Sequence, residues 1–141
     1  MDEEILQIDS SVILETLLEQ QRAEEGVRLF NLCARENRKV AVTAFSLYSV
    51  EIIACRHELY ARLDDWLEKL KGLSGLTVYH TSIEEEREVA RLVRTSRLDF
   101  DDALQYYVAK KTGARLVSYD KDFDLTDIRR VTPEEVLSPQ A

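Results

Sequence analysis

The chain contains four carboxylates at positions where apolar segments begin, end or are interrupted. They are Asp9, Glu51, Asp102 and Asp120. Carboxylates without a companion cluster of His or Cys suit a hard divalent cation such as Mg²⁺ or Mn²⁺. Such an ion lowers the pKa of a water molecule and stabilises negative charge on a phosphoryl oxygen. Hydrolysis of a phosphodiester is therefore the chemistry that these four residues favour.

Each acid also has an ordinary structural explanation, because helix starts are often acidic. Glu51 is the only charge in the apolar segment 40–55, which we expect to form a largely buried helix. A buried carboxylate needs a cation, a hydrogen-bond donor or a proton, and a structural Arg or Lys could serve Glu51 as well as a metal. The run 84–86 is most simply a helix start, and we expect Asp122 to be solvated loop surface along with Asp124 and Asp127.

Short apolar runs alternate with helical patterns along the whole chain. The expected strands are 5–8, 40–42, 76–80, 114–119 and a short 128–131. The expected helices follow Asp9, cover about 23–36, 43–55, 57–73, 100–112 and 133–137, and include one capped by Thr81 or Ser82. This alternation predicts an α/β protein with a mostly parallel sheet of four to five strands and helices on both faces.

Sites in such folds lie beyond the C-terminal ends of the strands. Asp9 and Asp120 follow two predicted strands, and Asp102 begins the helix that leads into the second of these. Glu51 would reach the same place from the helix after strand 40–42. Asp99 and Asp102 are three residues apart and can face the same way, while either Asp99 or Asp101 would be the helix N-cap.

The length of 141 residues predicts one domain that covers residues 1–141. The net charge of −8 disfavours a simple polyanion-binding protein, although acids that bind metal also contribute to it. Cys33 and Cys55 lack metal-ligand spacing and are expected to be small buried hydrophobic residues, not a disulfide, in a cytoplasmic protein. No signal peptide and no membrane-spanning run is visible.

These motifs together resemble the PIN-domain ribonucleases, in particular the small stand-alone toxins of the VapC type, over nearly the whole chain. The family's first acid, usually followed by Thr-Asn, matches Asp9, with Ser11 in place of the Asn. Its second acid, a Glu in an apolar helix, matches Glu51. Its third begins an Asp-Ala-Leu segment and matches Asp102. Its fourth closes a Leu-Val-Thr-x-Asp strand and matches Asp120, with Ser118 keeping the hydroxyl of the Thr.

The resemblance implies a three-layer α/β/α fold and Mg²⁺- or Mn²⁺-dependent endonucleolytic cleavage of RNA. The four matching acids would hold one or two ions, supported by Ser11, Asp99 and Ser118. Candidate contacts to the RNA backbone are Arg97, Lys110, Lys111 and Lys121. The resemblance also implies an antitoxin that inserts an Arg or Lys into the acidic pocket, and a homodimer.

One other class of protein remains open from the sequence, and two more lack residues that they would need. A catalytically inactive PIN-like module could act as a scaffold in RNA processing and keep the acids without the activity. A phosphoacceptor receiver domain would need paired acids after the first strand and a Lys at the end of a late strand, and the chain has neither. A phosphatase with an Asp-x-Asp nucleophile would need an Asp where Ser11 stands.

Overall fold

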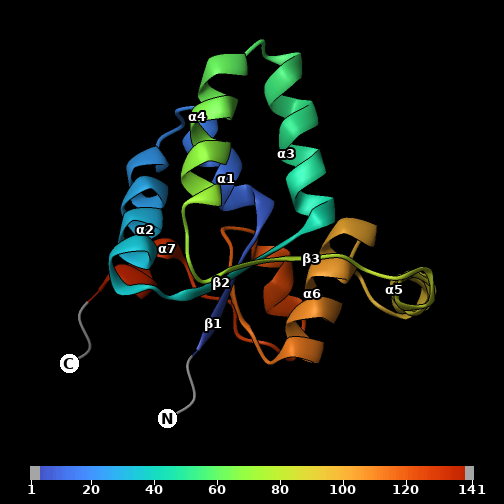
Figure 1. The fold of residues 1–141 in the computed structure, drawn as a ribbon. Helices are drawn as coiled ribbons and strands as arrows, with labels where there is room; N and C mark the ends of the chain where they lie inside the picture. The colour runs from blue at the N-terminus through green and yellow to red at the C-terminus, as the bar shows by residue number, and fades with distance from the viewer. Residues whose placement is uncertain (1–3, 139–141) are drawn as a thin grey trace.

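The computed structural model describes residues 4–138 and contains a four-stranded parallel sheet. Strand β1 (Ile5–Ile8) lies between β2 (Lys39–Thr43) and β4 (Arg115–Val117). Strand β3 (Leu76–Tyr79) pairs with the outer side of β2, so the strand order is β3-β2-β1-β4. Because all pairings are parallel, the C-terminal ends of the strands meet at one edge of the sheet (Figure 1).

Helices cover both faces of this sheet, as the alternating sequence pattern predicts. The helices are α1 (Ser10–Leu17), α2 (Ala23–Glu36), α3 (Ala44–Arg56), α4 (Tyr60–Lys71), α5 (Ile83–Thr95), α6 (Phe100–Thr112), the 3-10 turn η1 (Lys121–Leu125) and α7 (Pro133–Leu137). Helix α1 contacts α2, α3 and α4, while α7 packs on α2. Helix α6 contacts β4, η1 and α5 on the other side.

The alternation of side chains along β1 explains the layers. Leu6 and Ile8 are fully buried and belong to the main core, which also includes Leu29 of α2 and Leu70 of α4. Gln7, between them in sequence, points to the opposite face and bonds to α6. Successive residues of a strand face opposite sides, so one strand serves both layers.

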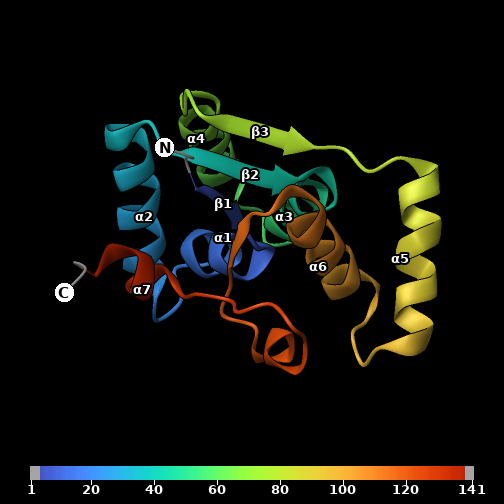
Figure 2. The same cartoon turned by 90° about the horizontal axis from the view of Figure 1, so that it is seen from below.

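A second, smaller core joins α5 to α6. Val89 of α5 packs with Leu104 and Val108 of α6, and Leu98 in the preceding loop completes the cluster. Helix α5 stands away from the sheet and reaches the rest of the protein mainly through α6 (Figure 2). Its outward face is therefore open to solvent along the length of the helix.

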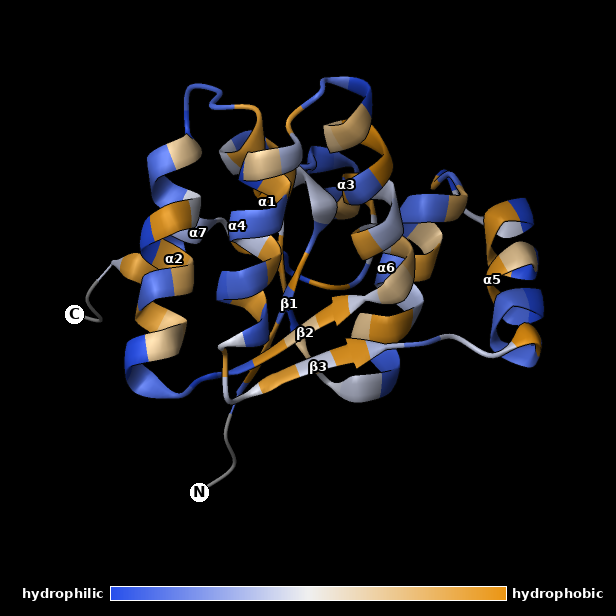
Figure 3. Ribbon diagram, turned by 45° about the horizontal axis from the view of Figure 1, so that its top comes forward, coloured by the Kyte–Doolittle hydropathy of each residue, from blue (hydrophilic) through white to orange (hydrophobic). Residues whose placement is uncertain are grey.

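The structure contradicts the expectation that the helix in segment 40–55 is largely buried. Phe45, Tyr48 and Ile52 of α3 are 37%, 55% and 53% exposed. They are spaced three and four residues apart, which places them on one helical face, and that face points away from the core. The hydropathy colouring shows apolar segments of α3 on its outer side (Figure 3).

Three smaller expectations are also corrected. The expected continuous helix over 57–73 is interrupted, because α3 ends at Arg56 and α4 begins at Tyr60, with Glu58 at a positive φ of 56°. Cys33 is buried but Cys55 is exposed, and both are free thiols. The expected strand 128–131 contributes only a single parallel bridge to Val117. None of the helices within residues 4–138 has the length and apolar character that a membrane crossing requires.

Candidate metal centre

Asp9 lies directly after β1 at the C-terminal edge of the sheet and is only 3% exposed. Its Oδ2 accepts hydrogen bonds from the hydroxyls of Ser11 and Ser118, each at 2.7 Å. The backbone N–H of Asp9 donates to the carbonyl of Val117 at 2.9 Å, which fixes the end of β1 against the end of β4. The carboxylate is thus oriented by two neutral donors.

The Ser118 hydroxyl connects the two acids that follow the strands. It donates to Asp9 and accepts a hydrogen bond of 2.9 Å from the backbone N–H of Asp120. The Ser11 hydroxyl accepts in turn from the backbone N–H of Tyr119 at 3.1 Å. The serines expected to support the first acid therefore also hold the loop that carries Asp120.

Helix α6 presents its first turn to the same place. Asp99 is the N-cap, and its Oδ1 accepts from the backbone N–H of Asp102 at 3.0 Å. The sequence left open whether Asp99 or Asp101 caps the helix, and the structure assigns the role to Asp99. Asp102 is 8% exposed, so its carboxylate lies at the buried side of the helix start.

The carboxylates of Asp102, Asp120 and Asp122 come together, with one oxygen from each lying within 4.8 Å of the others. Asp122 was expected to be solvated loop surface. It joins the group because Asp120 caps the 3-10 turn η1, accepting from the backbone N–H of Asp122 at 2.9 Å. Asp122 itself remains exposed to solvent. No sequence pattern distinguished it from Asp124 and Asp127, because the tight turn was not foreseen.

The electrostatics of this edge are those of crowded acids. Burial raises the pKa of Asp102 to about 8, with further contributions from Asp120, Asp99, Asp9 and Asp101. The pKa of Asp101 is raised to about 6, first by burial and then by the charge of Asp9. Burial also raises the pKa of Asp9, against the lowering effect of its two serine donors. Within residues 4–138, none of these acids has an ion-pair partner within 4 Å.

These residues fit a divalent cation. The donors are carboxylate oxygens alone, the set preferred by Mg²⁺ and Mn²⁺. In addition, Oδ1 of Asp101 is buried without a hydrogen-bond partner in the described part of the chain. A buried unpaired carboxylate oxygen is costly unless a cation or a proton compensates it. The site therefore lacks positive charge that it has the ligands to hold.

Glu51 stands apart from this group in the structure. It lies two turns along α3, is half-buried, and is not one of the three residues whose oxygens meet within 4.8 Å. Asp9 is also outside that trio, but it contributes to the raised pKa values of Asp101 and Asp102. The metal-ligand role of Glu51 stays a prediction.

A buried polar network lies beneath the acids and was not foreseen from the sequence. The side-chain amide of Gln105 on α6 donates to the hydroxyls of Thr43 and Ser46, at 2.8 and 2.9 Å. The amide of Gln7 on β1 donates to the backbone carbonyl of Gln105 at 3.0 Å and to its Oε1 at 3.1 Å. The network ties β1, β2, α3 and α6 together just below the ends that carry the acids. Buried, hydrogen-bonded amides of this kind fix the relative positions of the elements they join.

The expected RNA-contacting residues divide into two pairs. Lys110 is paired with Asp127 at 3.2 Å, and Lys111 with Glu85 at 2.6 Å, so both lysines are already engaged. Arg97 and Lys121 are exposed and form no ion pair within the described chain. Of the four candidates, these last two are the ones available to a phosphate.

The fold and the sequence together identify the class of protein. The chain belongs to the PIN domain family, because the model of that family matches residues 7–129. The predicted α/β fold with a central parallel sheet is thereby confirmed.

Solved structures extend the comparison. VapC20 from Mycobacterium tuberculosis, described as a sarcin–ricin loop cleaving toxin, superposes with a TM-score of 0.69 and 20% identity, over 91% of this chain and 99% of that chain. A toxin–antitoxin complex from Klebsiella pneumoniae gives a TM-score of 0.63 at 19% identity, over 91% and 97%. PAE2754 from Pyrobaculum aerophilum gives 0.66 at 19% identity, over 96% and 87%. At these identities the likeness establishes a common fold. The comparison with curated protein sequences finds no match.

Proposed function

We propose that the protein is a Mg²⁺- or Mn²⁺-dependent endoribonuclease that hydrolyses RNA phosphodiester bonds and acts as the toxin of a toxin–antitoxin pair. The observation that carries the proposal is the meeting of Asp102, Asp120 and Asp122 beside buried Asp9, with no Lys or Arg of residues 4–138 ion-paired to them. Membership of the PIN family and the fold shared with VapC20 support the same activity.

The chain's own residues have distinct roles in this proposal. Asp9, Asp102 and Asp120 would hold the ion together with Asp122 of η1. Glu51 of α3, which stands apart from them in this structure, is the remaining ligand of the predicted set. When bound, the ion supplies the positive charge that lowers the pKa of water and stabilises charge on a phosphoryl oxygen. The hydroxyls of Ser11 and Ser118 keep the Asp9 carboxylate in one orientation. The N-cap bond from Asp102 to Asp99 fixes the first turn of α6 in the same way.

The test is cleavage of single-stranded RNA by the purified protein. We expect internal cuts in the presence of Mg²⁺ or Mn²⁺, and loss of activity on addition of EDTA. Cleavage that survives complete chelation would contradict the metal-dependent mechanism. Binding of RNA without any cleavage in Mn²⁺ would instead favour the alternative, a catalytically inactive PIN-like scaffold in RNA processing.

We also propose an antitoxin partner that places an Arg or Lys among the acids. The support is the crowding of acids that raises the pKa of Asp101 and Asp102, and the fork geometry with which a guanidinium meets carboxylates. The structural neighbour from Klebsiella pneumoniae was solved as a toxin–antitoxin complex. We expect a cognate partner to lose affinity for the Asp9→Ala, Asp120→Ala double variant. An unchanged affinity would mean that the partner binds elsewhere.

A homodimer through α3 is the third part of the proposal. Phe45, Tyr48 and Ile52 form one exposed apolar face, and the ring of Phe45 lies 6.1 Å from that of Phe100, which extends this face to α6. Exposed apolar patches of this kind mark association surfaces. Sedimentation should show a dimer for the native protein and a monomer for Tyr48→Lys. A monomeric native protein would contradict this assignment.

A further inference from the structure

A cavity of about 460 Å³ lies between the end of α5, the first half of α6 and the end of η1. Its volume is in the range of pockets that hold small molecules, roughly 300–1,000 Å³. Its walls combine apolar and polar side chains. They include Leu92, Leu98, Tyr106 and Leu125 on the apolar side, and Arg97 and Thr126 on the polar side.

The cavity touches both segments that supply the acids. Arg97 and Leu98 directly precede Asp99, the N-cap of the helix that carries Asp102. Leu125 ends the turn η1, which begins after Asp120, and it follows Asp122 by three residues. At a rise of about 2.0 Å per residue, that separation is roughly 6 Å along the turn. A molecule in the cavity therefore contacts the two segments that also carry Asp99, Asp102, Asp120 and Asp122, although these acids do not line the cavity themselves.

Unpaired positive charge lies at the α5 end of this cavity. Arg97 lines it, and Arg91 lies on the same side of α5 as the cavity-lining Thr95, one turn earlier. Arg91, Arg94 and Arg97 are exposed, and none of them is hydrogen-bonded or ion-paired to another residue in the range 4–138. These three unpaired guanidinium groups, in the last turns of α5 and in the loop just after it, form a local basic surface on a protein whose net charge is −8.

The side chains that line the cavity favour a nucleic acid over an acidic peptide as the anionic ligand. Leucine side chains and the Tyr106 ring offer an apolar surface on which a nucleobase can stack. The Tyr106 hydroxyl donates to Asp127 at 2.6 Å, which holds the ring in place. The Ser96 hydroxyl accepts from the backbone N–H of Leu98 at 3.2 Å, and its own O–H remains available to a base edge. An acidic peptide could pair with the arginines, but it has no base to stack on the Tyr106 ring and the leucine side chains.

We propose that this cavity holds the base of a single-stranded RNA nucleotide that flanks the bond to be cut, with Arg97 and Arg91 binding the adjacent phosphates. The inference rests on the proposed ribonuclease function and specifies how its substrate is held. Helix α5, which stands away from the sheet, then extends the RNA-binding surface beyond the acids (Figure 2).

The first experiment measures binding of a fluorescent single-stranded RNA by anisotropy in EDTA, where metal-dependent cleavage cannot occur. Arg97→Glu should weaken binding about tenfold and reduce the slope of log affinity against log salt by about 0.7 for the lost phosphate contact. The matched control is Arg28→Glu on α2, an exposed arginine with no ion pair in the described chain, which makes the same charge change far from the cavity. Equal weakening by the two substitutions would overturn the proposal.

The second experiment tests the base. An abasic nucleotide is moved along the RNA, and at one position it should weaken binding about fivefold or more. Leu125→Ser should weaken binding of the intact RNA but add little to the loss at that abasic position. Leu125 is 63% exposed, so its truncation does not open the core. If abasic RNA binds as tightly as intact RNA at every position, the cavity takes no base and the proposal fails. Displacement of RNA by polyglutamate together with that result would assign the arginines to a protein partner.

Failure of this inference and failure of the proposed function give different results. Binding that depends on Arg97 without any Mn²⁺-dependent cleavage would keep the RNA site and reject the nuclease. Cleavage by the native protein combined with RNA binding that ignores Arg97 would reject the cavity and keep the nuclease.

Discussion

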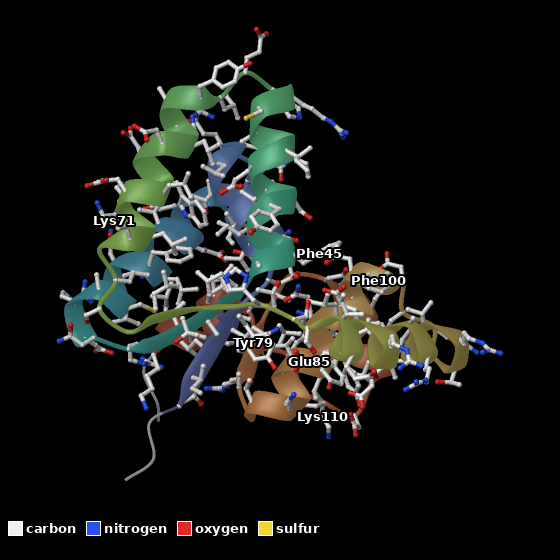
Figure 4. The ribbon with its side chains drawn as sticks, turned by 45° about the vertical axis from the view of Figure 1, so that its right-hand side comes forward. Phe45, Lys71, Tyr79, Glu85, Phe100 and Lys110 are labelled. Atoms are coloured by element: carbon white, nitrogen blue, oxygen red, sulfur yellow. The ribbon has the colours of Figure 1, made fainter. Side chains whose placement is uncertain are left out.

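Carboxylates near the two ends of α6 have pKa values shifted in opposite directions. At its C-terminal end, Glu85 of α5 accepts from Lys111 and from the Tyr79 hydroxyl, each at 2.6 Å, and from the Ser82 backbone N–H at 2.8 Å (Figure 4). The ammonium of Lys111 contributes most to lowering the pKa of Glu85 to about 2. At the N-terminal end, burial and four neighbouring acids raise the pKa of Asp102 to about 8.

The helix dipole alone predicts a favourable place for Asp102. A carboxylate at a helix N-terminus is stabilised by the dipole and the free N–H groups. The opposite shift shows that burial among uncompensated acids outweighs this effect. Glu85, which has a structural role, accepts hydrogen bonds from a lysine and a tyrosine. Within the described chain, no lysine or tyrosine donates to Asp102. Perturbed acids without partners are typical of sites whose charge is compensated by a ligand.

Asp120→Asn should give the largest effect on the acidic end. Loss of one electrostatic group from a preorganised site lowers rates by about 10²–10³-fold, and we expect Mn²⁺-dependent RNA cleavage to fall in that range. Initial rates on a single-stranded RNA provide the measurement. Glu85→Gln is the matched control from the other end of α6 and should stay within about twofold of the native rate. Similar losses of cleavage rate in both variants would contradict the prediction that only the acids at the N-terminal end of α6 take part in the reaction.

Asp122→Asn should lower the same rate by a smaller amount, about tenfold. Its carboxylate approaches those of Asp102 and Asp120 but remains exposed, so water replaces part of its effect. Asp124→Asn, in the same turn but outside the group, is the control. If Asp122→Asn cleaves RNA at the native rate, Asp122 has no role in the site and is solvated surface, as the sequence predicted.

Asp102→Asn should stabilise the metal-free protein. Near neutral pH, folding requires Asp102 either to take up a proton or to remain charged among other acids, and Asn avoids this cost. The N-cap is unaffected because that role belongs to Asp99. We expect the melting temperature in EDTA to rise by roughly 2–5 °C. The variant should gain less than the native protein from added Mn²⁺, because stabilisation by a ligand follows its affinity for the folded state. A lower melting temperature with an equal response to Mn²⁺ would place Asp102 outside the metal centre.

The pH dependence should have opposite signs at the two clusters. The pKa of Asp102 is raised on folding, so the native protein binds this proton more tightly than the unfolded chain. Its contribution to stability is therefore present below pH about 4 and is lost as pH rises through about 8. In urea unfolding with EDTA, the advantage of Asp102→Asn over the native protein should grow across that window. A constant difference would contradict the raised pKa.

The smallest effect should come from Glu85→Gln. The pKa of Glu85 is lowered on folding, so its contribution is present above pH about 4.5 and is lost as pH falls toward about 2. Lys111 is half-exposed, which limits what the pair adds. We expect a fall of about 1–2 °C in melting temperature near pH 7, and no difference from the native protein below pH 2. If Glu85→Gln lowers the melting temperature more at acidic pH than at neutral pH, the lowered pKa of Glu85 is contradicted.

Local rules predict most of the fold. Alternating strands and helices indicate the parallel sheet, and Gly113, at a φ of 72°, ends α6 where the sequence places its stop. Asp9 and Asp120 could be assigned to one edge because parallel strands end together. Those positions depend on short-range patterns and on a general rule of topology.

Other features depend on contacts that no local pattern encodes. The outward face of α3 could not be recognised, because Phe45, Tyr48 and Ile52 have the same periodicity as a buried stripe. Asp122 enters the cluster through a tight turn capped by Asp120. The pairing of Gln7 with Gln105 spans 98 residues, and isolated glutamines give no sign of burial.

The place of β1 in the sheet has a consequence for synthesis of the chain. Asp9 is made early, but its hydrogen-bond partner Ser118, the residue directly after β4, follows 109 residues later. At about 5–20 residues per second, the ribosome needs roughly 5–20 s to add the residues between them. Until then β1 has no β4 to pair with, and the carboxylates at its edge are not assembled. The acidic cluster of Asp9, Asp102 and Asp120 therefore cannot assemble on the nascent chain until β4 and the residues that follow it have been made.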